Sequence, residues 1–351
     1  MTGTHEQQIR AGCRVLVTGA SGFVGRMLCD LLLRTGYRVR GSSRAPASPA
    51  VGSSALEWAQ VGALSAQTDW SQALQDVDAV VHLAARVHHP GEPAMRVAAL
   101  HHRTNCEGTV RLVEMAAAAG VRRLVFLSTV KVNGKRTVRH AGGSWQRYSE
   151  DDVPHPQGAY AQSKWEAEQA LLEIAARGPM AVTILRPPLV YGPGVGANFL
   201  RLVRAVQKGI PLPFAQVVNM RSLVYVENLA EAILVCMESK AATNKTYLVR
   251  DVDVSTPDLI YAVAKVLGCR PRLMRMPLWA LRLGGVLTLR SATVSRLVDS
   301  LLVDDSRIRG ELFWTPSMTM QQGLARTAAW LGVKTPEPGH RARHESGTAR
   351  S

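Results

Sequence analysis

The sequence predicts an α/β fold, in which a Rossmann-type doubly wound parallel sheet is followed by a smaller C-terminal region. Short β-branched runs alternate with longer helical patterns through the first half of the chain, as expected for parallel strands joined by crossover helices. The strand runs are almost continuously apolar, which is typical of strands buried on both faces. A glycine-rich turn directly follows the first of these runs.

Strands and helical segments are expected to alternate up to residue 186. The strands fall at 14–18, 38–42, 57–61, 78–83, 122–128 and 181–186. The helical patterns fall at 23–35, 69–75, 93–119 and 159–177. Glycine and proline cluster after residue 186 and the alternation weakens, which predicts a boundary between a domain at 13–186 and a second region at 187–332. Residues 1–12 and 333–351 are polar, so we expect a flexible N-terminus and a disordered tail.

The composition fits a large globular protein that binds anionic small molecules. The chain has 351 residues, of which 46% are hydrophobic, enough for a sizeable core. Its 42 Lys and Arg residues exceed its 27 Asp and Glu residues, which gives a net charge of +15. The basic residues are scattered and lack interleaved aromatic residues or zinc-finger spacing, so no nucleic-acid partner is expected. The charge suits anionic ligands instead.

The cysteines and the apolar segments predict a cytoplasmic protein without a metal ion. There are five cysteines and no C-x-x-C pair, which predicts neither a disulfide framework nor a metal site. The N-terminal residues lack the apolar stretch of a secretion signal. The segment 277–289 is apolar but too short to span a membrane, and it contains Arg282. We therefore expect a core helix and no stable membrane insertion, with contact to a membrane surface as the alternative.

The glycine turn TGASGFVG, residues 18–25, has the strand–turn–helix context of a dinucleotide-binding motif. Gly19 would allow the tight turn, Gly22 would let the backbone approach a pyrophosphate, and Gly25 would let the helix pack close to the strand. Phe23 and Val24 open the helix, whose free N–H groups and positive dipole end would face the phosphates. A ligand-free glycine turn is the alternative.

The end of the second strand bears on the choice of cofactor. An acidic residue about 20 positions after the glycine turn would bind the ribose hydroxyls of NAD. The sequence has Ser43 and Arg44 there, with Arg40 nearby and no carboxylate. Serine and arginine suit a 2′-phosphate, so we expect NADPH. NAD, with Arg44 solvated or stacked on the adenine, is the alternative.

Tyr160 and Lys164 form the expected acid–base pair. They lie four residues apart in a helical pattern and therefore share one helix face. A phenol with a pKa near 10 needs a nearby positive charge to act at neutral pH, and the lysine ammonium supplies it. Ser128 and Thr129 end the fifth strand, at the sheet edge where α/β ligands bind, and either hydroxyl could hold the substrate oxygen.

Taken together, these motifs resemble the extended short-chain dehydrogenase/reductase family, also described as NAD-dependent epimerases and dehydratases. The resemblance covers about residues 13–332. It is carried by TGASGFVG at 18–25, HLAA at 82–85, N-x-x-G-T at 105–109, LST at 127–129, YAQSK at 160–164, RPPLVYGP at 186–193 and RSLVYVENLA at 221–230. The last two are typical of enzymes that act on nucleotide sugars.

The resemblance implies a role for each matching position. Thr129, with Ser128 beside it, would be the hydroxyl that works with Tyr160 and Lys164. Cofactor contacts would come from the glycine turn, from Lys164 and from the backbone after the fourth strand, at Leu83, Ala84 and Ala85. The substrate diphosphate would lie against Asn198 and Arg221, and a homodimer would form through the helices at 93–119 and 159–177.

Departures from the family pattern narrow the expected chemistry. Val130 and Lys131 follow Thr129 where dehydratases of this family carry Asp and Glu, so dehydration is not expected. Epimerases that hold NAD tightly carry Asp where Ser43 stands. The acidic residue that usually lies beneath the adenine is replaced at 62–64 by Gly-Ala-Leu.

The expected activity is reduction of a UDP-4-keto-6-deoxy-N-acetylhexosamine at C4, since the motifs resemble 4-reductases of bacterial surface polysaccharide (O-antigen) synthesis. The region at 187–332 would then bind the nucleotide sugar. The alternative is an NAD-dependent UDP-hexose or UDP-N-acetylhexosamine 4-epimerase. A non-catalytic NADPH-sensing relative is a distant alternative because Tyr160 and Lys164 are both present. A reductase of apolar ketones would have no use for Arg221.

Overall fold

The computed structural model describes residues 9–45, 55–87, 94–288 and 291–333. Its larger sheet has seven parallel strands in the order β3-β2-β1-β4-β5-β6-β9. These strands are β1 (Arg14–Thr18), β2 (Arg38–Ser43), β3 (Leu56–Gln60), β4 (Ala79–His82), β5 (Arg123–Leu127), β6 (Ala181–Arg186) and β9 (Lys245–Leu248). This confirms the predicted Rossmann-type sheet. The strand order reverses between β1 and β4, which is where such sheets bind ligands.

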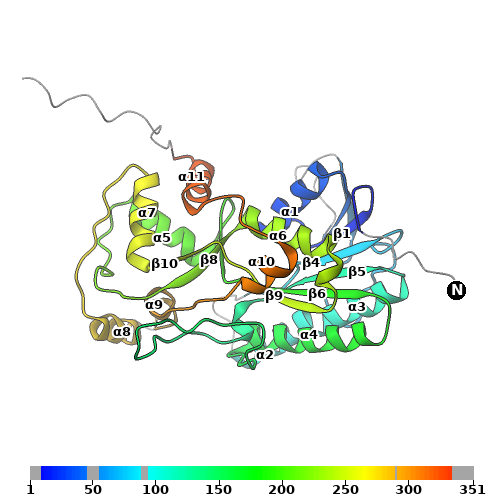
Figure 1. The fold of residues 1–351 in the computed structure, drawn as a ribbon, viewed down its shortest axis with the longest axis horizontal. Coiled ribbons are helices and arrows are strands. Elements are labelled where there is room, and N and C mark those ends of the chain that lie inside the picture. The colour runs from blue at the N-terminus through cyan, green and yellow to red at the C-terminus, as the bar shows by residue number, and fades with distance from the viewer. Residues whose placement is uncertain (1–8, 46–54, 88–93, 289–290, 334–351) are drawn as a thin grey trace, which may run out of the picture.

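Helices cover both faces of this sheet, as Figure 1 shows. One face carries α1 (Phe23–Arg34) and α6 (Val226–Glu238), and the other carries α3 (Gly108–Ala118) and α4 (Ala159–Ala176). Each layer is filled by fully buried aliphatic side chains such as Leu28 and Ile233 on the first face and Leu112 and Leu171 on the second. Because α6 and β9 come from beyond residue 187, the second half of the chain completes the large sheet and its cover.

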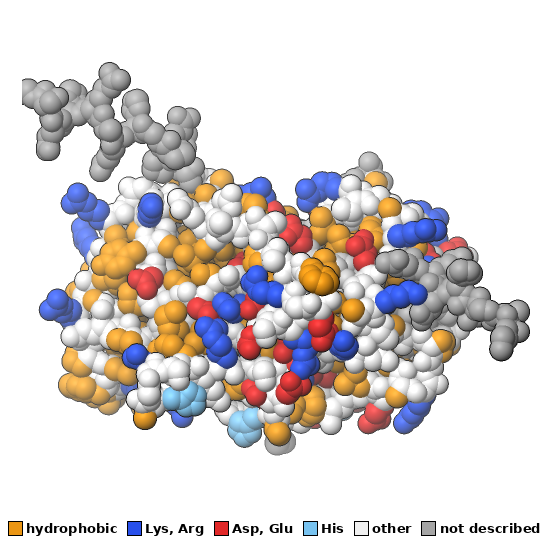
Figure 2. All heavy atoms as spheres, in the orientation of Figure 1, with side chains coloured by type: hydrophobic (Ala, Val, Ile, Leu, Met, Phe, Trp, Pro, Cys, Tyr) orange, Lys and Arg blue, Asp and Glu red, His pale blue; other side chains and the backbone are white. Residues whose placement is uncertain are grey.

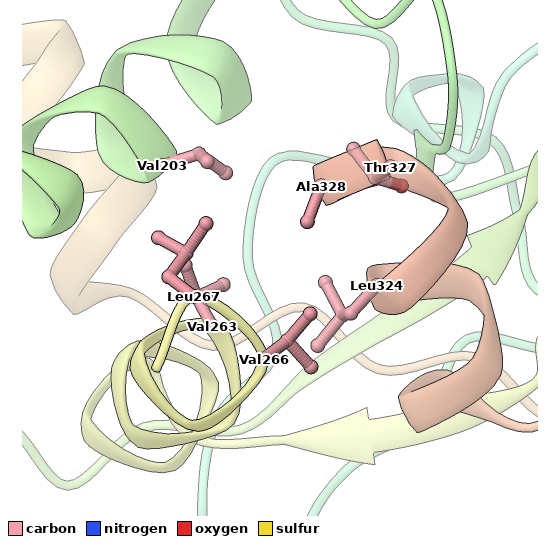
Figure 3. A pocket seen from close by; sticks show the side chains of 7 residues that line it. All are labelled: Val203, Val263, Val266, Leu267, Leu324, Thr327 and Ala328. Carbon is pink, nitrogen blue, oxygen red and sulfur yellow. The ribbon is translucent and has the colours of Figure 1, made fainter. Parts of the chain in front are cut away.

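A smaller lobe lies beside this sheet (Figure 1). It contains the three-stranded sheet β10-β8-β7, formed by β7 (Leu189–Tyr191), β8 (Arg221–Tyr225) and β10 (Val252–Val254). Around it pack α5 (Ala197–Gln207), α7 (Thr256–Val266) and α11 (Met320–Trp330). Side chains of these three helices enclose an apolar cavity of about 10 Å³, drawn in Figure 3. That volume holds at most one water, so the cavity is a packing defect and not a ligand site.

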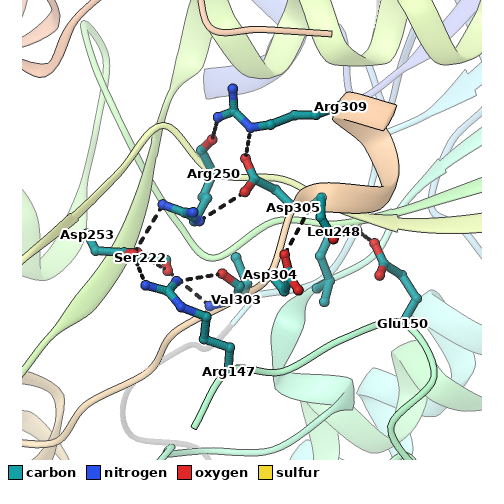
Figure 4. A network of polar contacts seen from close by, with 11 residues as sticks. Arg147, Glu150, Ser222, Leu248, Arg250, Asp253, Val303, Asp304, Asp305 and Arg309 are labelled. Atoms are coloured by element: carbon teal, nitrogen blue, oxygen red, sulfur yellow. Dashed lines mark hydrogen bonds and ion pairs between the residues drawn. The ribbon is translucent and has the colours of Figure 1, made fainter. Parts of the chain in front are cut away.

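A polar network joins this lobe to the loop that follows β5 (Figure 4). Arg147 of that loop pairs with Asp253 on β10 at 2.6 Å and donates to the Val303 carbonyl at 3.0 Å. Asp305 accepts ion pairs from Arg250 at 3.1 Å and from Arg309 at 2.6 Å. The segment around Val303 is therefore held between the loop and the small sheet. This fixes the loop that begins beside Thr129.

Two helical expectations are wrong in detail. Residues 71–76 form hydrogen-bonded turns in place of the helix expected at 69–75, and the Asp69 carboxylate accepts from the Ser71 amide and hydroxyl at 3.0 and 2.7 Å at their start. The segment 93–119 is not one α-helix but α2 (Ala94–His101), a π-helical stretch (His102–Glu107) and α3. The extra residue of each π turn rotates Asn105 inward, where it is buried.

The segment 277–289 is a helix, but the expectation that it lies in the core is wrong. It forms α8 (Leu278–Leu287), which packs on α9 (Ser291–Val298) at the surface of the small lobe. Only Leu281 and Gly285 of α8 are buried. Short 3-10 turns (Val130–Val132 and Lys240–Ala242) and α10 (Ser306–Leu312) complete the described elements. None of the described helices is long and apolar enough to cross a membrane. Of the termini expected to be flexible or disordered, 1–8 and 334–351 lie outside the described residues.

Candidate active site

The glycine turn lies at the carboxyl end of β1, beside the switch point. Gly19 has φ +70°, and a Cβ there would lie 2.9 Å from the Ala84 amide nitrogen. A Cβ on Gly25 would lie 2.1 Å from the Gly19 carbonyl oxygen, so only glycine allows α1 to start this close to β1. No side chain caps the N-terminus of α1, which leaves its first N–H groups for an anion. This cradle fits a dinucleotide pyrophosphate.

The backbone after β4 closes the other side of this cradle. The Thr18 hydroxyl accepts from the Ala84 amide at 3.1 Å and contacts His82 Nδ1 at 2.6 Å. His82 is fully buried between Thr18 and Thr109, and burial lowers its pKa to about 3. A neutral, doubly hydrogen-bonded imidazole serves structure here. It brings Leu83, Ala84 and Ala85 beside the glycine turn, as the HLAA motif predicts.

The end of β2 carries no carboxylate. Ser43 is half-buried and its hydroxyl donates to the Ala45 carbonyl at 2.6 Å. Arg44 is exposed. Arg40 is turned away, since it pairs with Glu57 at 3.1 Å and donates to carbonyls of residues 72–75. Of the arginines noted in the sequence, Arg44 is thus the one available to a 2′-phosphate.

Tyr160 and Lys164 lie one turn apart on α4, in different surroundings. Tyr160 is half-buried, and burial raises its pKa to about 12. Lys164 is fully buried with its ammonium 3.8 Å from the centre of the Phe126 ring. Burial lowers the pKa of Lys164 to about 7, although the negative charge of Glu168 acts in the opposite direction. The phenol is therefore protonated at neutral pH, and the ammonium is poised to titrate.

The hydroxyls of Ser128 and Thr129 point to different partners. Ser128 donates to the carboxylate of Glu168, which forms a buried ion pair with Arg186. Arg186 binds that carboxylate through Nε, at 3.1 Å from each oxygen, and through Nη2. Thr129 accepts from the Lys131 amide at 3.3 Å, which leaves its own hydroxyl proton free to donate. Thr129 is thus the hydroxyl available to a substrate, and Ser128 belongs to the support beneath it.

Three cations, Lys131, Arg221 and Arg296, lie near one another on the side of Tyr160, and this cluster is called the anion hollow below. The Lys131 ammonium lies 5.5 Å from the centre of the Tyr160 ring. The Lys131 residue is exposed, but its surroundings still desolvate the ammonium and thereby lower its pKa. The charges of Arg296, Arg221 and Lys135 lower this pKa further. Burial likewise lowers the pKa of Arg221 to about 10, while the charge of Asp299 raises it and that of Arg296 lowers it. A cluster with three cations suits an anion.

Asn198 lies in the first turn of α5, whose N-terminus no side chain caps. Free N–H groups at a helix start suit a phosphate. Its helix follows β7, which pairs with the β8 strand that begins at Arg221. Among the described residues, no hydrogen bond or ion pair joins Asn198 to Arg221, so the structure places both in the small lobe without bringing them together directly.

The site also includes residues that the sequence reasoning did not single out. Asn105 binds the backbone of Arg86 through both amide atoms, at 2.7 and 3.1 Å, and donates to the Ser163 hydroxyl at 3.1 Å. It thereby joins the loop after β4 to the helix that carries Tyr160. The N-x-x-G-T motif at 105–109 was the sequence feature that could have indicated this role of Asn105. Arg186 also belongs to a matched motif, whereas Glu168 lies just beyond the YAQSK motif, and Lys131 and Arg296 come together only through the fold.

One group of side chains has the spacing of a metal site. His102, Cys106 and Glu166 present ligand atoms within 4.8 Å of one another. His102 Nδ1 lies 2.8 Å from a Glu166 carboxylate oxygen, which accounts for both groups as an ordinary hydrogen-bonded pair. Burial raises the pKa of Cys106 to about 11, so the sulfur remains a thiol and a poor ligand at neutral pH.

The glycine cradle, the Tyr-Lys helix and the anion hollow define an α/β enzyme that uses a dinucleotide. The family model described as "NAD dependent epimerase/dehydratase family" matches residues 15–249, and the chain belongs to this family. A Vibrio cholerae protein named UDP-glucose 4-epimerase is 38% identical over 317 residues, covering 90% of this chain and 94% of that protein.

Two further relatives show how widely this family varies. An Escherichia coli O157:H7 protein named N-acetyl-alpha-D-glucosaminyl-diphospho-ditrans,octacis-undecaprenol 4-epimerase is 26% identical over 331 residues, covering 89% of this chain and 93% of that protein. The structure of MoeE5 in complex with UDP-glucuronic acid and NAD superposes with a TM-score of 0.71 at 28% identity, covering 91% of this chain and 99% of that chain. The chain is thus a member of the NAD-dependent epimerase/dehydratase family, and the relatives named here act on or bind nucleotide sugars and related sugar diphosphates.

Proposed function

We propose that the protein is an NADPH-dependent reductase that converts the C4 ketone of a UDP-4-keto-6-deoxy-N-acetylhexosamine to an alcohol, for surface polysaccharide (O-antigen) synthesis. NADPH supplies the hydride when bound. The protein supplies the proton, the orientation of the sugar and the binding of the diphosphate. The observation that carries the proposal is the end of β2, where Ser43 and Arg44 stand without a carboxylate.

Ketone reduction requires a proton donor at the reacting oxygen. Burial holds the pKa of Tyr160 near 12, so the phenol carries its proton at neutral pH. The same residue would serve an epimerase as the base that takes a proton from the C4 hydroxyl, so the protonation state of Tyr160 does not by itself separate the two activities. In the proposed reduction, the Tyr160 hydroxyl would donate to the developing C4 alkoxide, while Thr129, with its free hydroxyl proton, holds the same oxygen in place.

The cofactor preference rests on the end of β2. Ser43 and Arg44 stand there without a carboxylate, and Arg40 is engaged by Glu57. A positive side chain favours a 2′-phosphate by a charge-assisted hydrogen bond. The nicotinamide ribose would lie against Lys164, and the pyrophosphate against Gly22, Phe23 and Val24 at the start of α1.

The substrate diphosphate would lie in the hollow with Arg221 and Arg296, near the start of α5 at Asn198. Two arginines match the two charges of the diphosphate. Lys131 is the remaining cation, and its position over the Tyr160 ring places it beside the sugar. The acidic pair that dehydratases of this family carry after the threonine is replaced here by Val130 and Lys131, so dehydration is not the proposed activity.

The proposal is tested with purified protein and two substrates. A UDP-4-keto-6-deoxy-N-acetylhexosamine is mixed with NADPH, and the loss of NADPH absorbance is compared with the amount of alcohol formed. Equal amounts of NADPH consumed and alcohol formed support reduction. In parallel, UDP-N-acetylglucosamine is incubated without added cofactor. Many turnovers to the C4 epimer in that reaction would show that the protein is not a reductase.

The second candidate is a UDP-hexose or UDP-N-acetylhexosamine 4-epimerase with bound NAD. The name of the Vibrio cholerae relative and the NAD of the MoeE5 complex favour it. Mass spectrometry of the protein as purified separates the candidates, because an epimerase of this kind retains NAD. A homodimer through the outer faces of α3 and α4 is compatible with either activity. Light scattering of the wild-type protein tests it.

A further inference from the structure

The outer face of α8 is a surface feature that the proposed activity does not use. Trp279, Leu283, Val286 and Leu287 are 70%, 51%, 60% and 74% exposed. Their spacing of i, i+4, i+7 and i+8 places them on one face of the helix. Figure 2 shows hydrophobic side chains gathered at the corner of the molecule where Figure 1 places α8. We call these four side chains the α8 stripe.

The opposite face of α8 explains why the stripe points outward. Gly285 lies against Val294 of α9, where an added Cβ would lie only 2.9 Å from a valine methyl. Leu281, on the same side, is buried. The helix is therefore anchored to the protein through its small and inner residues. Its largest apolar side chains are left facing solvent.

The surroundings of the stripe are rich in positive charge. Residues 259–298 contain seven Lys and Arg residues and no Asp or Glu, although Asp258 and Asp299 flank this range. Arg270, Arg272 and Arg275 are exposed on the segment that leads into α8, whereas Arg282 on α8 itself is paired with Asp299. A basic surface beside an exposed apolar stripe complements a bilayer, whose interior is apolar and whose headgroups are anionic.

We propose that α8 is an interfacial helix that docks the protein on an anionic lipid bilayer. The stripe would enter the boundary between headgroups and acyl chains, with Trp279 at the interface and the arginines on lipid phosphates. A helix of ten residues lies on such a surface and does not span it. A second copy of the chain is a poorer occupant, because it would bring the same positive surface against itself.

The docking helix is connected to the proposed substrate site. Arg282 pairs with the Asp299 carboxylate at 3.1 Å, and the Asp299 carbonyl accepts from Arg221 at 3.0 Å. Docking through α8 would therefore hold the anion hollow close to the membrane surface. This inference does not depend on which sugar reaction the protein catalyses, since it concerns a surface that the reaction does not use.

Co-sedimentation of the full chain with vesicles tests the proposal. Wild-type protein should partition at least about tenfold more onto vesicles of phosphatidylglycerol and phosphatidylethanolamine than onto phosphatidylcholine alone. The variant Leu287→Glu should lose about tenfold or more of this binding, because a charge replaces an inserted leucine. The double variant Arg272→Gln with Arg275→Gln should lose binding to the anionic vesicles by about tenfold as well.

Val153→Glu is the matched control, because Val153 is also an exposed apolar residue (87% exposed) but does not belong to the α8 stripe. Its neighbours in sequence, Asp151 and Asp152, are acidic and not basic. It should bind vesicles as the wild type does, and all variants should retain the wild-type melting temperature. Equal vesicle binding by Leu287→Glu and wild type would overturn the proposal. Wild-type protein that stays in the supernatant would also overturn it. The same holds if wild-type protein does not bind vesicles and Leu287→Glu reduces the size of its oligomer, because the α8 stripe would then contact another copy of the chain.

Discussion

Replacing Glu168 by Gln should destabilise the protein and shift its activity to lower pH. Glu168 and Arg186 are buried, with three contacts between guanidinium and carboxylate. Removing one charge leaves the other without compensation, which typically costs about 3–5 kcal/mol. At about 2.1 cal/mol/K per residue, a chain of 351 residues has an unfolding entropy of about 0.7 kcal/mol/K. The melting temperature should therefore fall by about 4–7 °C.

The same substitution should act on Lys164. Glu168 raises the pKa of Lys164 against the effect of burial, so its removal should take that pKa below the wild-type value of about 7. If the ammonium form is needed for turnover, the alkaline limb of the rate profile should move to lower pH. The dependence of kcat on pH, measured with saturating NADPH, shows the shift of the alkaline limb. It is measured separately from the melting temperature, which shows the loss of stability.

Glu173→Gln is the matched control on the same helix. Glu173 pairs with Arg177 at 3.9 Å, and both side chains are largely exposed, so the pair should contribute little. Scanning fluorimetry of the three proteins at one pH compares them directly. A Glu168→Gln variant that melts within about 1 °C of Glu173→Gln and keeps the wild-type pH profile would refute the reasoning.

Further predictions concern the proton donor, the cofactor and the glycine turn. Tyr160→Phe should lower kcat by about 100-fold or more, since a proton donor typically contributes that much, while NADPH binding measured by fluorescence titration stays unchanged. Arg44→Ala should weaken NADPH binding by about tenfold or more and leave NADH binding unaltered; equal effects on both would show that Arg44 does not contact the 2′-phosphate. Gly25→Ala should abolish dinucleotide binding and lower the melting temperature, because its Cβ would overlap the Gly19 carbonyl, whereas Gly178→Ala, with open space around it, should do neither.

The sheet was predictable because its strands are buried on both faces and therefore read as apolar runs. The strand β9 could not be predicted, because its four residues, Lys-Thr-Tyr-Leu, do not form an apolar run. They become a strand by pairing with β6. The segment 69–75 was mistaken for a helix because the apolar spacing of so short a segment fits a run of turns, here at 71–76, as well as a helix. The apolar composition of α8 predicted a core helix, but the structure places it at the surface. The local sequence does not indicate which face of this helix is covered by its neighbour α9.

The candidate site also has residues that the sequence predicts and residues that only the fold brings together. Gly19, Gly25, Tyr160 and Lys164 act through residues near them in sequence, so their spacing indicates their geometry. Whether Ser128 or Thr129 faces the substrate depends on Glu168 of another element, which the sequence does not place. Lys131 and Arg296 likewise meet only when α9 and the turn after β5 are brought together.

The contribution of the second half of the chain to the large sheet has a consequence for synthesis on the ribosome. The α1 face of the sheet is covered by α6, and the edge of β6 is paired by β9, so both elements must emerge before that face is closed. A nascent chain that ends near residue 186 exposes Leu28, Leu32 and an unpaired strand edge to solvent and to other chains. Chaperone dependence should therefore persist until β9 has left the exit tunnel, and a stable expression fragment needs an end point beyond Leu248.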